Sequence, residues 1–311
     1  MASERVRVIL NPRAAGGRAL GRLSMVEAAL RRDELDYEIV LTQGPGDATL
    51  LARAAMADGI RVLVAMGGDG TLNEVVQAFV DKDGAPVPGP DLALIPAGTG
   101  GDFKRTLGLS DEVDDAVRRI RHGTRREVDL GILQFLPHAG QSGVRAFVNV
   151  ASFGIGGQVD SIVNRTPKWL GGKASFFVAT LRAMASYRNA NVRVKVDGET
   201  WYEGSVFNVA IANGRFFGGG MMIAPQADAS DGQFEVICIG DLTKIEAAGL
   251  SSKIYKGAHL SAPGVKVARG TRIEAEPIHP WATVLMDVDG EQPGKLPLSA
   301  TMARCALTFR T

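Results

Sequence analysis

A glycine-rich loop with an acidic centre is the part of the sequence that most plainly suggests chemistry. Residues 67–71 read GGDGT and lie between an apolar run at 62–66 and a helical pattern. Free backbone N–H groups at a helix start bind anions such as phosphate. The loop lacks the ending of a Walker loop and the spacing of a dinucleotide fingerprint. We expect an anion-binding loop, with a strand-to-helix turn capped by Asp69 as the alternative.

Two acidic motifs further along the chain could hold a cation or accept a proton. In DASDGQF (228–234), the carboxylates of Asp228 and Asp231 and the carbonyl of Gln233 suit Mg²⁺. A polar β-turn before a strand is the alternative. In VLMDVDGEQPG (284–294), Asp289 or Glu291 could accept the proton of a hydroxyl nucleophile. A plain hairpin turn is the alternative there.

The elements that would position these groups alternate between strand and helix in the first part of the chain. The predicted strands are 5–10, 37–41, 61–65 and 91–95, and the predicted helices are 18–31, 47–57 and 71–80. This alternation predicts an α/β fold with a mostly parallel sheet covered on both faces. Ligands bind at the carboxyl ends of such strands. We therefore expect the loops at 11–17, 42–47, 67–71 and 96–102 to converge on one crevice.

After about residue 128 the pattern changes to short β-rich runs separated by Asp-Gly turns. This predicts a second, mostly antiparallel β-sandwich-like domain, interrupted by one helix at 172–187. The expected domains are 1–128, completed by 296–311, and 129–295. The predicted strands of the second domain are 144–151, 191–196, 205–212, 233–239, 265–275 and 282–288, and a last strand at 302–309 returns to the first domain.

Six motifs together resemble the diacylglycerol kinase and sphingosine kinase family of lipid kinases, and its bacterial members in particular. They are NPRAAGG, GGDGTLNEVV, IPAGTGGDF, NGRFFGGGMMIAP, DASDGQFEV and VDGE, in the order that the family has them. The resemblance implies an ATP-binding α/β domain and a β-sandwich domain. It implies an ATP site lined by Asn11, Thr42, Gly67, Gly68, Asp69, Gly70, Thr71, Leu72, Asn73 and Thr99.

The resemblance also assigns roles to the acidic motifs. It implies that Asp228, Asp231 and Gln233 bind a structural Mg²⁺, and that Asp289 and Glu291 are catalytic. We favour Glu291 as the base and leave the choice between the two open. Asp69 would either bind or orient the Mg²⁺ of the nucleotide or brace its loop through backbone hydrogen bonds. Gly101 stands where the family usually has Asn, which puts any contact of that side chain in doubt.

These features predict an ATP-dependent lipid kinase that phosphorylates diacylglycerol or a related lipid alcohol, with ATP and Mg²⁺ as cofactors. A kinase with a soluble acceptor, of the NAD kinase type, is one alternative, because such kinases share the GGDGT loop. A nucleotide-binding sensor without catalysis is the other, and Gly101 is the feature that favours it.

The charge distribution bears on location and partners. A net charge of +1 argues against nucleic acid as a partner. Residues 161–196 contain seven Lys or Arg, interleaved aromatics and no Asp or Glu. Such a segment suits an anionic membrane surface, although a core helix with solvated cations explains it equally well. With neither a signal peptide nor a spanning helix expected, we predict a cytoplasmic protein, peripheral at the inner membrane face, and the sequence allows a homodimer.

Overall fold

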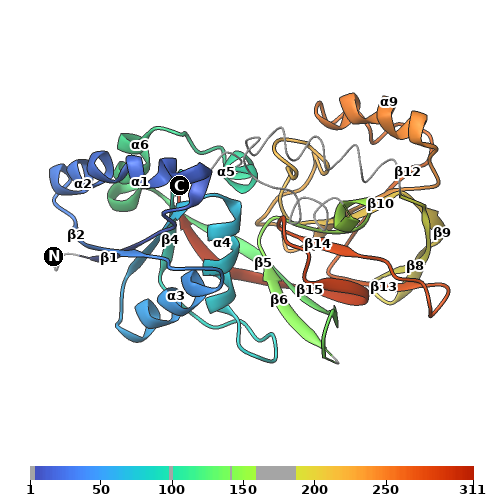
Figure 1. Cartoon of the computed structure of the whole chain (residues 1–311), viewed down its shortest axis with the longest axis horizontal. Coiled ribbons are helices and arrows are strands. Elements are labelled where there is room, and N and C mark those ends of the chain that lie inside the picture. Colours follow the sequence, from blue (N-terminus) through green and yellow to red (C-terminus); the bar gives the residue numbers. More distant parts are fainter. Residues whose placement is uncertain (1–3, 98–100, 141, 159–186) are drawn as a thin grey trace.

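The computed structural model describes residues 4–97, 101–140, 142–158 and 187–311. Its first part is a parallel sheet in the order β2-β1-β3-β4, as predicted (Figure 1). The strands are β1 (Arg5–Leu10), β2 (Asp36–Leu41), β3 (Val62–Gly67) and β4 (Asp91–Pro96). Nearly every residue of β1, β3 and β4 is buried, which is the pattern of strands covered on both faces.

Helices cover the two faces of this sheet. Residues of α2 (Leu23–Arg32) and α6 (Val113–His122) share one buried apolar cluster with Val8 and Val64. Residues of α3 (Asp47–Ala57) and α4 (Asp69–Val76) share another with Ile9 and Leu63. The alternation of strand side chains between these clusters is what a two-sided core requires. The remaining short helices here are η1 (Ala14–Gly17), α1 (Arg18–Gly21), η2 (Gln77–Phe79) and α5 (Asp102–Leu107).

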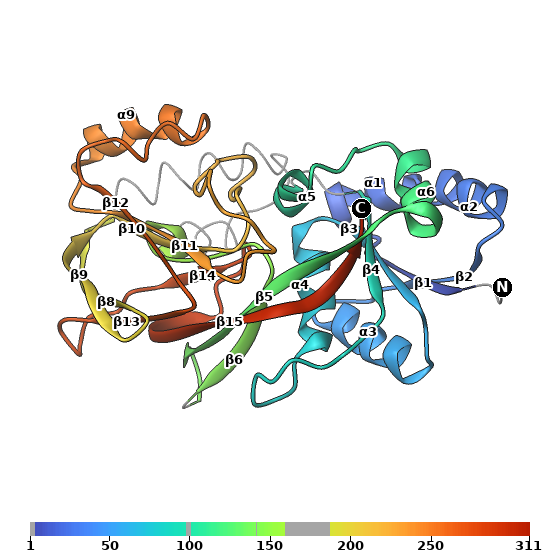
Figure 2. The same cartoon turned by 180° about the vertical axis from the view of Figure 1, so that it is seen from behind.

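Two long antiparallel strands, β5 (Arg125–Pro137) and β15 (Gly294–Arg310), run from the first part of the molecule into the second (Figure 2). β15 pairs in parallel with β4 near its end and antiparallel with β13 (Arg272–Pro277) nearer its start. The same sheet continues through β8 (Ala190–Val196) and β9 (Glu199–Val206), and β6 (Gly143–Phe147) pairs with β5. The nucleotide-type sheet and the β-rich part are therefore joined by continuous hydrogen bonding.

A second, antiparallel sheet completes the β-rich part. Its order is β12-β11-β10-β7-β14. The strands are β12 (Val265–Gly270), β11 (Phe234–Ile239), β10 (Asn208–Ala212), β7 (Val150–Gly154) and β14 (Met286–Val288). Aromatic and β-branched residues from both sheets, including Phe147, Phe153, Phe234 and Val192, form one buried cluster between them. This is the sandwich core that the alternating pattern predicts.

Several elements were not predicted, among them β5, α6 and α9 (Lys244–Ile254). The run at 128–136 is almost wholly apolar and belongs to β5, which is buried along most of its length instead of alternating. α6 shows helical spacing in Val113, Ala116, Val117 and Ile120 and could have been found. α9 begins at a capping box formed by Thr243 and Glu246. The predicted helix at 172–187 lies outside the described residues except for its last position.

Candidate functional site

The loops at the carboxyl ends of β1, β2, β3 and β4 meet, as predicted. The backbone N–H of Asn11 donates to the carbonyl of Met66 (3.1 Å), and its side-chain amide donates to Thr71 Oγ1 (3.2 Å). The N–H of Thr42 donates to the carbonyl of Leu10 (2.9 Å). The N–H of Ala97 donates to Gly67 at the end of β3 (2.9 Å). Thr99 lies outside the described residues.

Within the GGDGT loop, Gly67 is required for close packing. A Cβ atom at this position would lie 2.2 Å from Thr71 Oγ1 and 2.6 Å from Thr71 Cβ. Gly70, in the first turn of α4, has nothing within 4 Å of such an atom, and its residue is exposed. The start of α4 therefore combines a tight strand-to-helix turn with an open surface at Gly70, which leaves room for a ligand at the helix N-terminus.

The carboxylate of Asp69 braces a neighbouring helix. Its Oδ2 accepts hydrogen bonds from the backbone N–H groups of Gly101 (2.7 Å) and Asp102 (3.1 Å), and its Oδ1 accepts one from Phe103 (3.2 Å). These donors are the unpaired N–H groups at the start of α5. The bracing interpretation of Asp69 thus describes its contacts in this structure. The loop carries a negative charge because the N-terminus of α5 needs an acceptor for its unpaired backbone N–H groups.

The departure from the family pattern at Gly101 has a backbone explanation. Gly101 has φ of 90° and ψ of 45°, a left-handed conformation that glycine adopts without a steric penalty. Its N–H still reaches Asp69, so the loop keeps this backbone contact without the side chain.

Asp102 and Arg105 link α5 to the glycine-rich loop at 213–221. Asp102 Oδ2 accepts the N–H of Gly219 (2.7 Å), and its Oδ1 pairs with Arg105 (2.5 Å). Burial, and then the nearby Asp69 carboxylate, raise the pKa of Asp102, while the Gly219 and Arg105 hydrogen bonds oppose the rise. Asp102 was not among the predicted site residues, and the structure places it at the junction of the crevice with the β-rich part.

The carboxylate of Asp289 lies under a backbone loop and is held by four donors. Its Oδ1 accepts the N–H groups of Asn149 (3.2 Å) and Val150 (2.8 Å), and its Oδ2 accepts the N–H of Val148 (3.0 Å) and the side-chain amide of Asn73 (3.1 Å). Burial raises the pKa of Asp289 to about 6, and these hydrogen bonds oppose the rise. Asp289 therefore fixes its turn against the strands β6 and β7.

Glu291, two residues on, is the more accessible carboxylate of the pair. Its side chain is 38% exposed, and its Oε2 forms an ion pair with Arg145 of β6. Arg145 also donates to Asn73 Oδ1 (2.7 Å). Asn73 thus connects the predicted nucleotide loop with the predicted catalytic turn, although the two are more than 200 residues apart in the chain. Arg145 was missed, because a lone arginine on a strand carries no sequence signal for this role.

Leu72 is the apolar member of the predicted nucleotide-site residues. Its side chain is buried in the apolar cluster that α4 shares with β3. Its side chain therefore anchors the helix, and its assignment to the nucleotide site stays a prediction that concerns its backbone.

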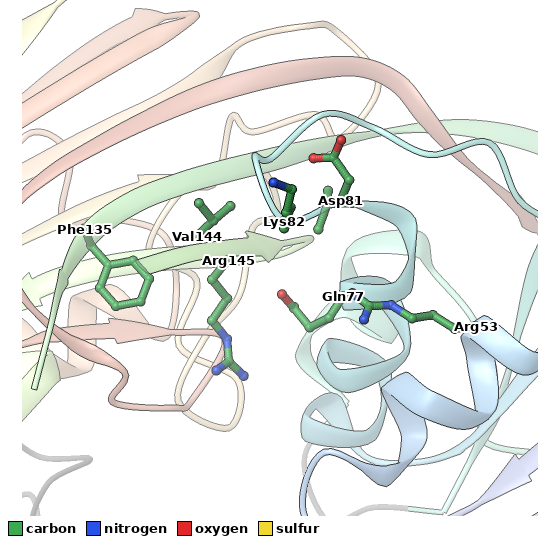
Figure 3. Close-up of a pocket in the computed structure, with 8 residues that line it drawn as sticks. Arg53, Gln77, Asp81, Lys82, Phe135, Val144 and Arg145 are labelled. Atoms are coloured by element: carbon green, nitrogen blue, oxygen red, sulfur yellow. The ribbon is translucent and has the colours of Figure 1, made fainter. Parts of the chain in front are cut away.

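A cavity of about 350 Å³ lies beside Arg145, between α4 and the hairpin of β5 and β6. Figure 3 shows the guanidinium of Arg145 directed away from Asp81 and Lys82 on the far side of this cavity. Gln77 spans the same gap, because its side-chain amide donates to the carbonyl of Ala146 (2.9 Å) and accepts the N–H of Ala146 (3.0 Å). The end of α4 is thereby fixed to the strand that carries Arg145.

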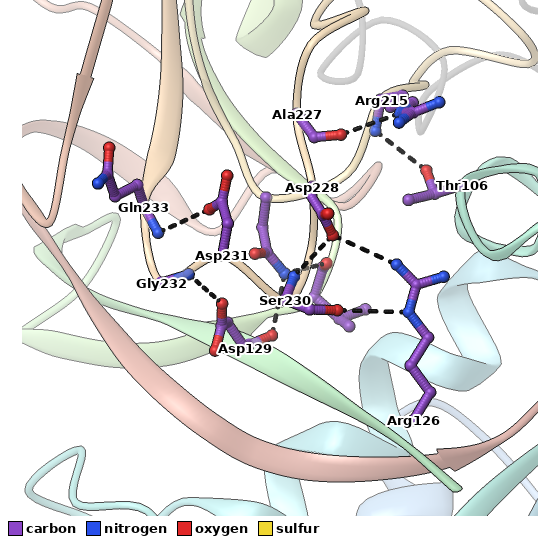
Figure 4. A network of polar contacts seen from close by, with 12 residues as sticks. Thr106, Arg126, Asp129, Arg215, Ala227, Asp228, Ser230, Asp231, Gly232 and Gln233 are labelled. Carbon is purple, nitrogen blue, oxygen red and sulfur yellow. Dashed lines mark hydrogen bonds and ion pairs between the residues drawn. The ribbon is translucent and has the colours of Figure 1, made fainter. Parts of the chain in front are cut away.

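The predicted magnesium motif forms a hydrogen-bonded loop (Figure 4). Asp228 accepts from Ser230 N–H (3.1 Å) and from Arg126 (3.3 Å). Asp231 accepts from Gln233 N–H (3.0 Å) and pairs with Arg269. Across the described ranges, no three His, Cys, Asp or Glu residues gather as metal ligands do.

Each carboxylate of this motif is therefore already paired with an arginine. The assignment of Asp228, Asp231 and Gln233 to a Mg²⁺ site stays a prediction, and a cation there would have to replace these arginines.

Asp129 of β5 anchors this loop from below. It is 1% exposed, and its carboxylate accepts the N–H groups of Gly232 (2.6 Å) and Cys305 (2.7 Å). Cys305 lies at an irregular point of β15 with φ of 50°. One buried carboxylate thus ties together β5, β15 and the 228–233 loop.

Only the end of the basic segment at 161–196 falls within the described residues. There Arg193 pairs with Glu203 and Glu276 across neighbouring strands, and Tyr187 packs edge-on against Phe207. These positions are structural. None of the helices in the described ranges combines the length and the hydropathy that a bilayer crossing requires.

Comparison with known proteins matches both parts of the chain. Residues 5–133 match the diacylglycerol kinase catalytic domain, and residues 149–310 match the YegS C-terminal NAD kinase beta sandwich-like domain. A diacylglycerol kinase of Staphylococcus aureus (strain JH9) is 29% identical over 300 residues, which cover 94% of this chain and 88% of that protein.

Solved structures share the fold. A diacylglycerol kinase from Bacillus anthracis str. Sterne aligns with a TM-score of 0.72 at 22% identity, over 100% of this chain and 97% of that one. Yeast NADH kinase complexed with NADH aligns with a TM-score of 0.51 at 11% identity, over 99% of this chain and 83% of that one. At these identities the likeness describes architecture alone.

Proposed function

The chain belongs to the diacylglycerol kinase family and is an ATP-dependent kinase, and from this premise we propose that it transfers the γ-phosphate of ATP to a lipid hydroxyl, with diacylglycerol as the acceptor. The observation that carries this proposal is the hydrogen bond between Asn73 and Asp289 (3.1 Å). It connects the loop suited to a nucleotide with the acidic turn suited to a hydroxyl nucleophile.

The nucleotide would bind at the crevice formed by the strand ends. The N-terminus of α4 and the open surface at Gly70 suit the phosphates of the Mg²⁺ complex of ATP. Asn11 and Thr42 border the same crevice. Asp69 contributes indirectly, because it holds the start of α5 in place.

The acceptor would be activated at the acidic turn. Glu291 keeps one carboxylate oxygen out of its ion pair with Arg145, and its side chain reaches solvent. It is placed to accept the hydroxyl proton as the lipid oxygen bonds to the γ-phosphorus and the bond to the ADP oxygen breaks. Asp289 is saturated with donors and acts by holding this turn.

A membrane-bound acceptor implies work at a membrane surface. We include in the proposal a peripheral attachment through the segment at 161–196, on the cytoplasmic face, because its basic and aromatic composition suits anionic lipid.

Transfer of labelled γ-phosphate to a panel of acceptors tests the proposal. The panel contains diacylglycerol, monoacylglycerol, sphingosine, ceramide and phosphatidylglycerol in mixed micelles, with NAD⁺ as the soluble acceptor. Label in diacylglycerol is the expected result. Label in NAD⁺ alone would assign a soluble acceptor, and bound ATP without any labelled acceptor would contradict transfer altogether.

A further inference from the structure

Arg145 joins the two halves of the site, although no motif contains it. Its guanidinium donates to Asn73 Oδ1 (2.7 Å) and pairs with Glu291 Oε2. Asn73 in turn donates its amide N–H to Asp289. The four side chains form one chain of contacts, Glu291–Arg145–Asn73–Asp289, which runs from the acidic turn through β6 to α4 and back to the same turn.

The chemistry of these groups fixes their orientation. A guanidinium has donors only, and an ionised carboxylate has acceptors only. The side chain of Asn73 is fully buried, so its amide must present oxygen to Arg145 and nitrogen to Asp289. Without Arg145, the Asn73 oxygen would lose the partner that selects this orientation, and the amide could rotate to point nitrogen away from Asp289.

Arg145 also controls the position of Glu291. Glu291 is 38% exposed, and a carboxylate on a turn with that exposure samples several rotamers unless it is tied down. The ion pair uses Oε2 and leaves Oε1 available. Arg145 itself is set by its strand, because β6 pairs with β5 and places Arg145 opposite Leu133.

We propose that Arg145 is a positioning residue for phosphoryl transfer, which holds Glu291 at a fixed distance from the nucleotide loop through its joint contact with Asn73. This inference rests on the proposed function, because it concerns the same transfer step. It adds a residue that neither touches the reacting atoms nor belongs to the motifs of the sequence.

The test compares Arg145→Met and Arg145→Lys with Arg32→Met, a matched variant that removes an arginine with two ion pairs at the end of α2, outside the site. The measured quantities are kcat, KM for ATP and KM for the acceptor. We expect kcat of Arg145→Met to fall about 100-fold, because a displacement of about 1 Å at a reacting group has an effect of that size. KM for ATP should stay within about threefold, and Arg32→Met should keep the kcat of the wild type.

The lysine variant separates positioning from folding. Both contacts of Arg145 come from one nitrogen, Nη2. Lysine keeps the charge and several N–H donors on one nitrogen but lacks the planar guanidinium that fixes their direction, so we expect it to recover about tenfold of the lost kcat. If Arg145→Met does not fold, as judged by its thermal unfolding, the kcat of the lysine variant decides alone, with a fall of about tenfold expected.

Two results would overturn the inference. One is a folded Arg145→Met with kcat within twofold of wild type, and the other is a loss confined to KM for ATP. The proposed function fails separately, through a wild-type enzyme that labels no lipid. If the wild type labels NAD⁺ instead, the kcat of Arg145→Met is compared with that of the wild type using NAD⁺ as the acceptor. A kcat within twofold of wild type would then also overturn the inference.

Discussion

Replacing Asp69 with asparagine tests why a phosphate-type loop carries a carboxylate. In the structure Asp69 accepts three backbone N–H groups from the start of α5, two of them at one oxygen. An asparagine that keeps its oxygen toward Phe103 turns its own N–H₂ toward the N–H groups of Gly101 and Asp102. Two charge-assisted hydrogen bonds are then lost, each worth about 1.5–3 kcal/mol.

The lower end of that range applies, because Asp69 is only half-buried and water can reach its partners. We therefore expect Asp69→Asn to lower the free energy of unfolding by about 3 kcal/mol. In a chain of this size that corresponds to a fall in Tm of about 6 °C. The fall should be seen without nucleotide or metal, and kinase activity should fall with it because Asp69 connects the GGDGT loop to the start of α5.

Thermal unfolding in the presence of EDTA is the assay, and Asp197→Asn is the matched control. Asp197 also accepts backbone N–H groups, from Thr271 and Arg272, but on the distant β-rich part. The control should lose stability and keep kcat. An Asp69→Asn protein with unchanged Tm, whose activity returns at high Mg²⁺ concentration, would refute the bracing role and restore the metal role.

Three further predictions address other parts of the site. Gly67→Ala should lower the free energy of unfolding by about 1–3 kcal/mol and weaken ATP binding. Gly70→Ala should keep wild-type stability, since its Cβ meets nothing within 4 Å. Equal Tm values for the two variants would contradict the packing role of Gly67. The pKa of Asp289 is about 6 in the folded protein and about 3.9 in an unfolded chain, so protonation favours the folded state. The free energy of unfolding should therefore rise, by up to about 3 kcal/mol, as pH falls from about 6 to about 4, while kinase activity falls because a protonated carboxyl group cannot accept all four donors. Asp289→Asn should show neither trend. In the wild type, a free energy of unfolding that falls together with kinase activity over this pH range would contradict the predicted direction of the stability change. Asp129→Asn should lower the free energy of unfolding by about 3 kcal/mol, because a buried backbone N–H loses its acceptor; urea unfolding within 1 kcal/mol of wild type would contradict this.

The crevice could be predicted because it follows from general rules of α/β folds. The carboxyl ends of parallel strands lie at one edge of a sheet, so Asn11, Thr42 and the 67–71 loop had to meet once the strand–helix alternation was recognised. The role of Asp69 could not be decided in the same way. A carboxylate suits a metal and a helix N-terminus equally well, and only the position of α5 distinguishes them.

The rest of the site depends on contacts between residues far apart in the chain. Arg145 and Asp129 lie on β6 and β5, and their roles come from pairing partners that no local pattern encodes. β5 itself was missed because a strand buried on both faces has no alternation to read. The magnesium motif was assigned through the resemblance to the lipid kinases, and neither the resemblance nor the spacing reveals that Arg126 and Arg269 pair with its two carboxylates.

The rate of diacylglycerol phosphorylation by Glu291→Gln tests the central claim most directly. The measurement uses labelled γ-phosphate at saturating Mg²⁺–ATP, with Glu276→Gln, an ion-paired glutamate on the distant strand β13, as the matched control. We expect kcat of Glu291→Gln to fall by about 10²–10⁴-fold, the usual contribution of a general base. The kcat of Glu276→Gln should equal that of the wild type, and both variants should bind ATP with wild-type affinity. A Glu291→Gln enzyme that phosphorylates diacylglycerol within threefold of the wild-type rate would contradict the central claim.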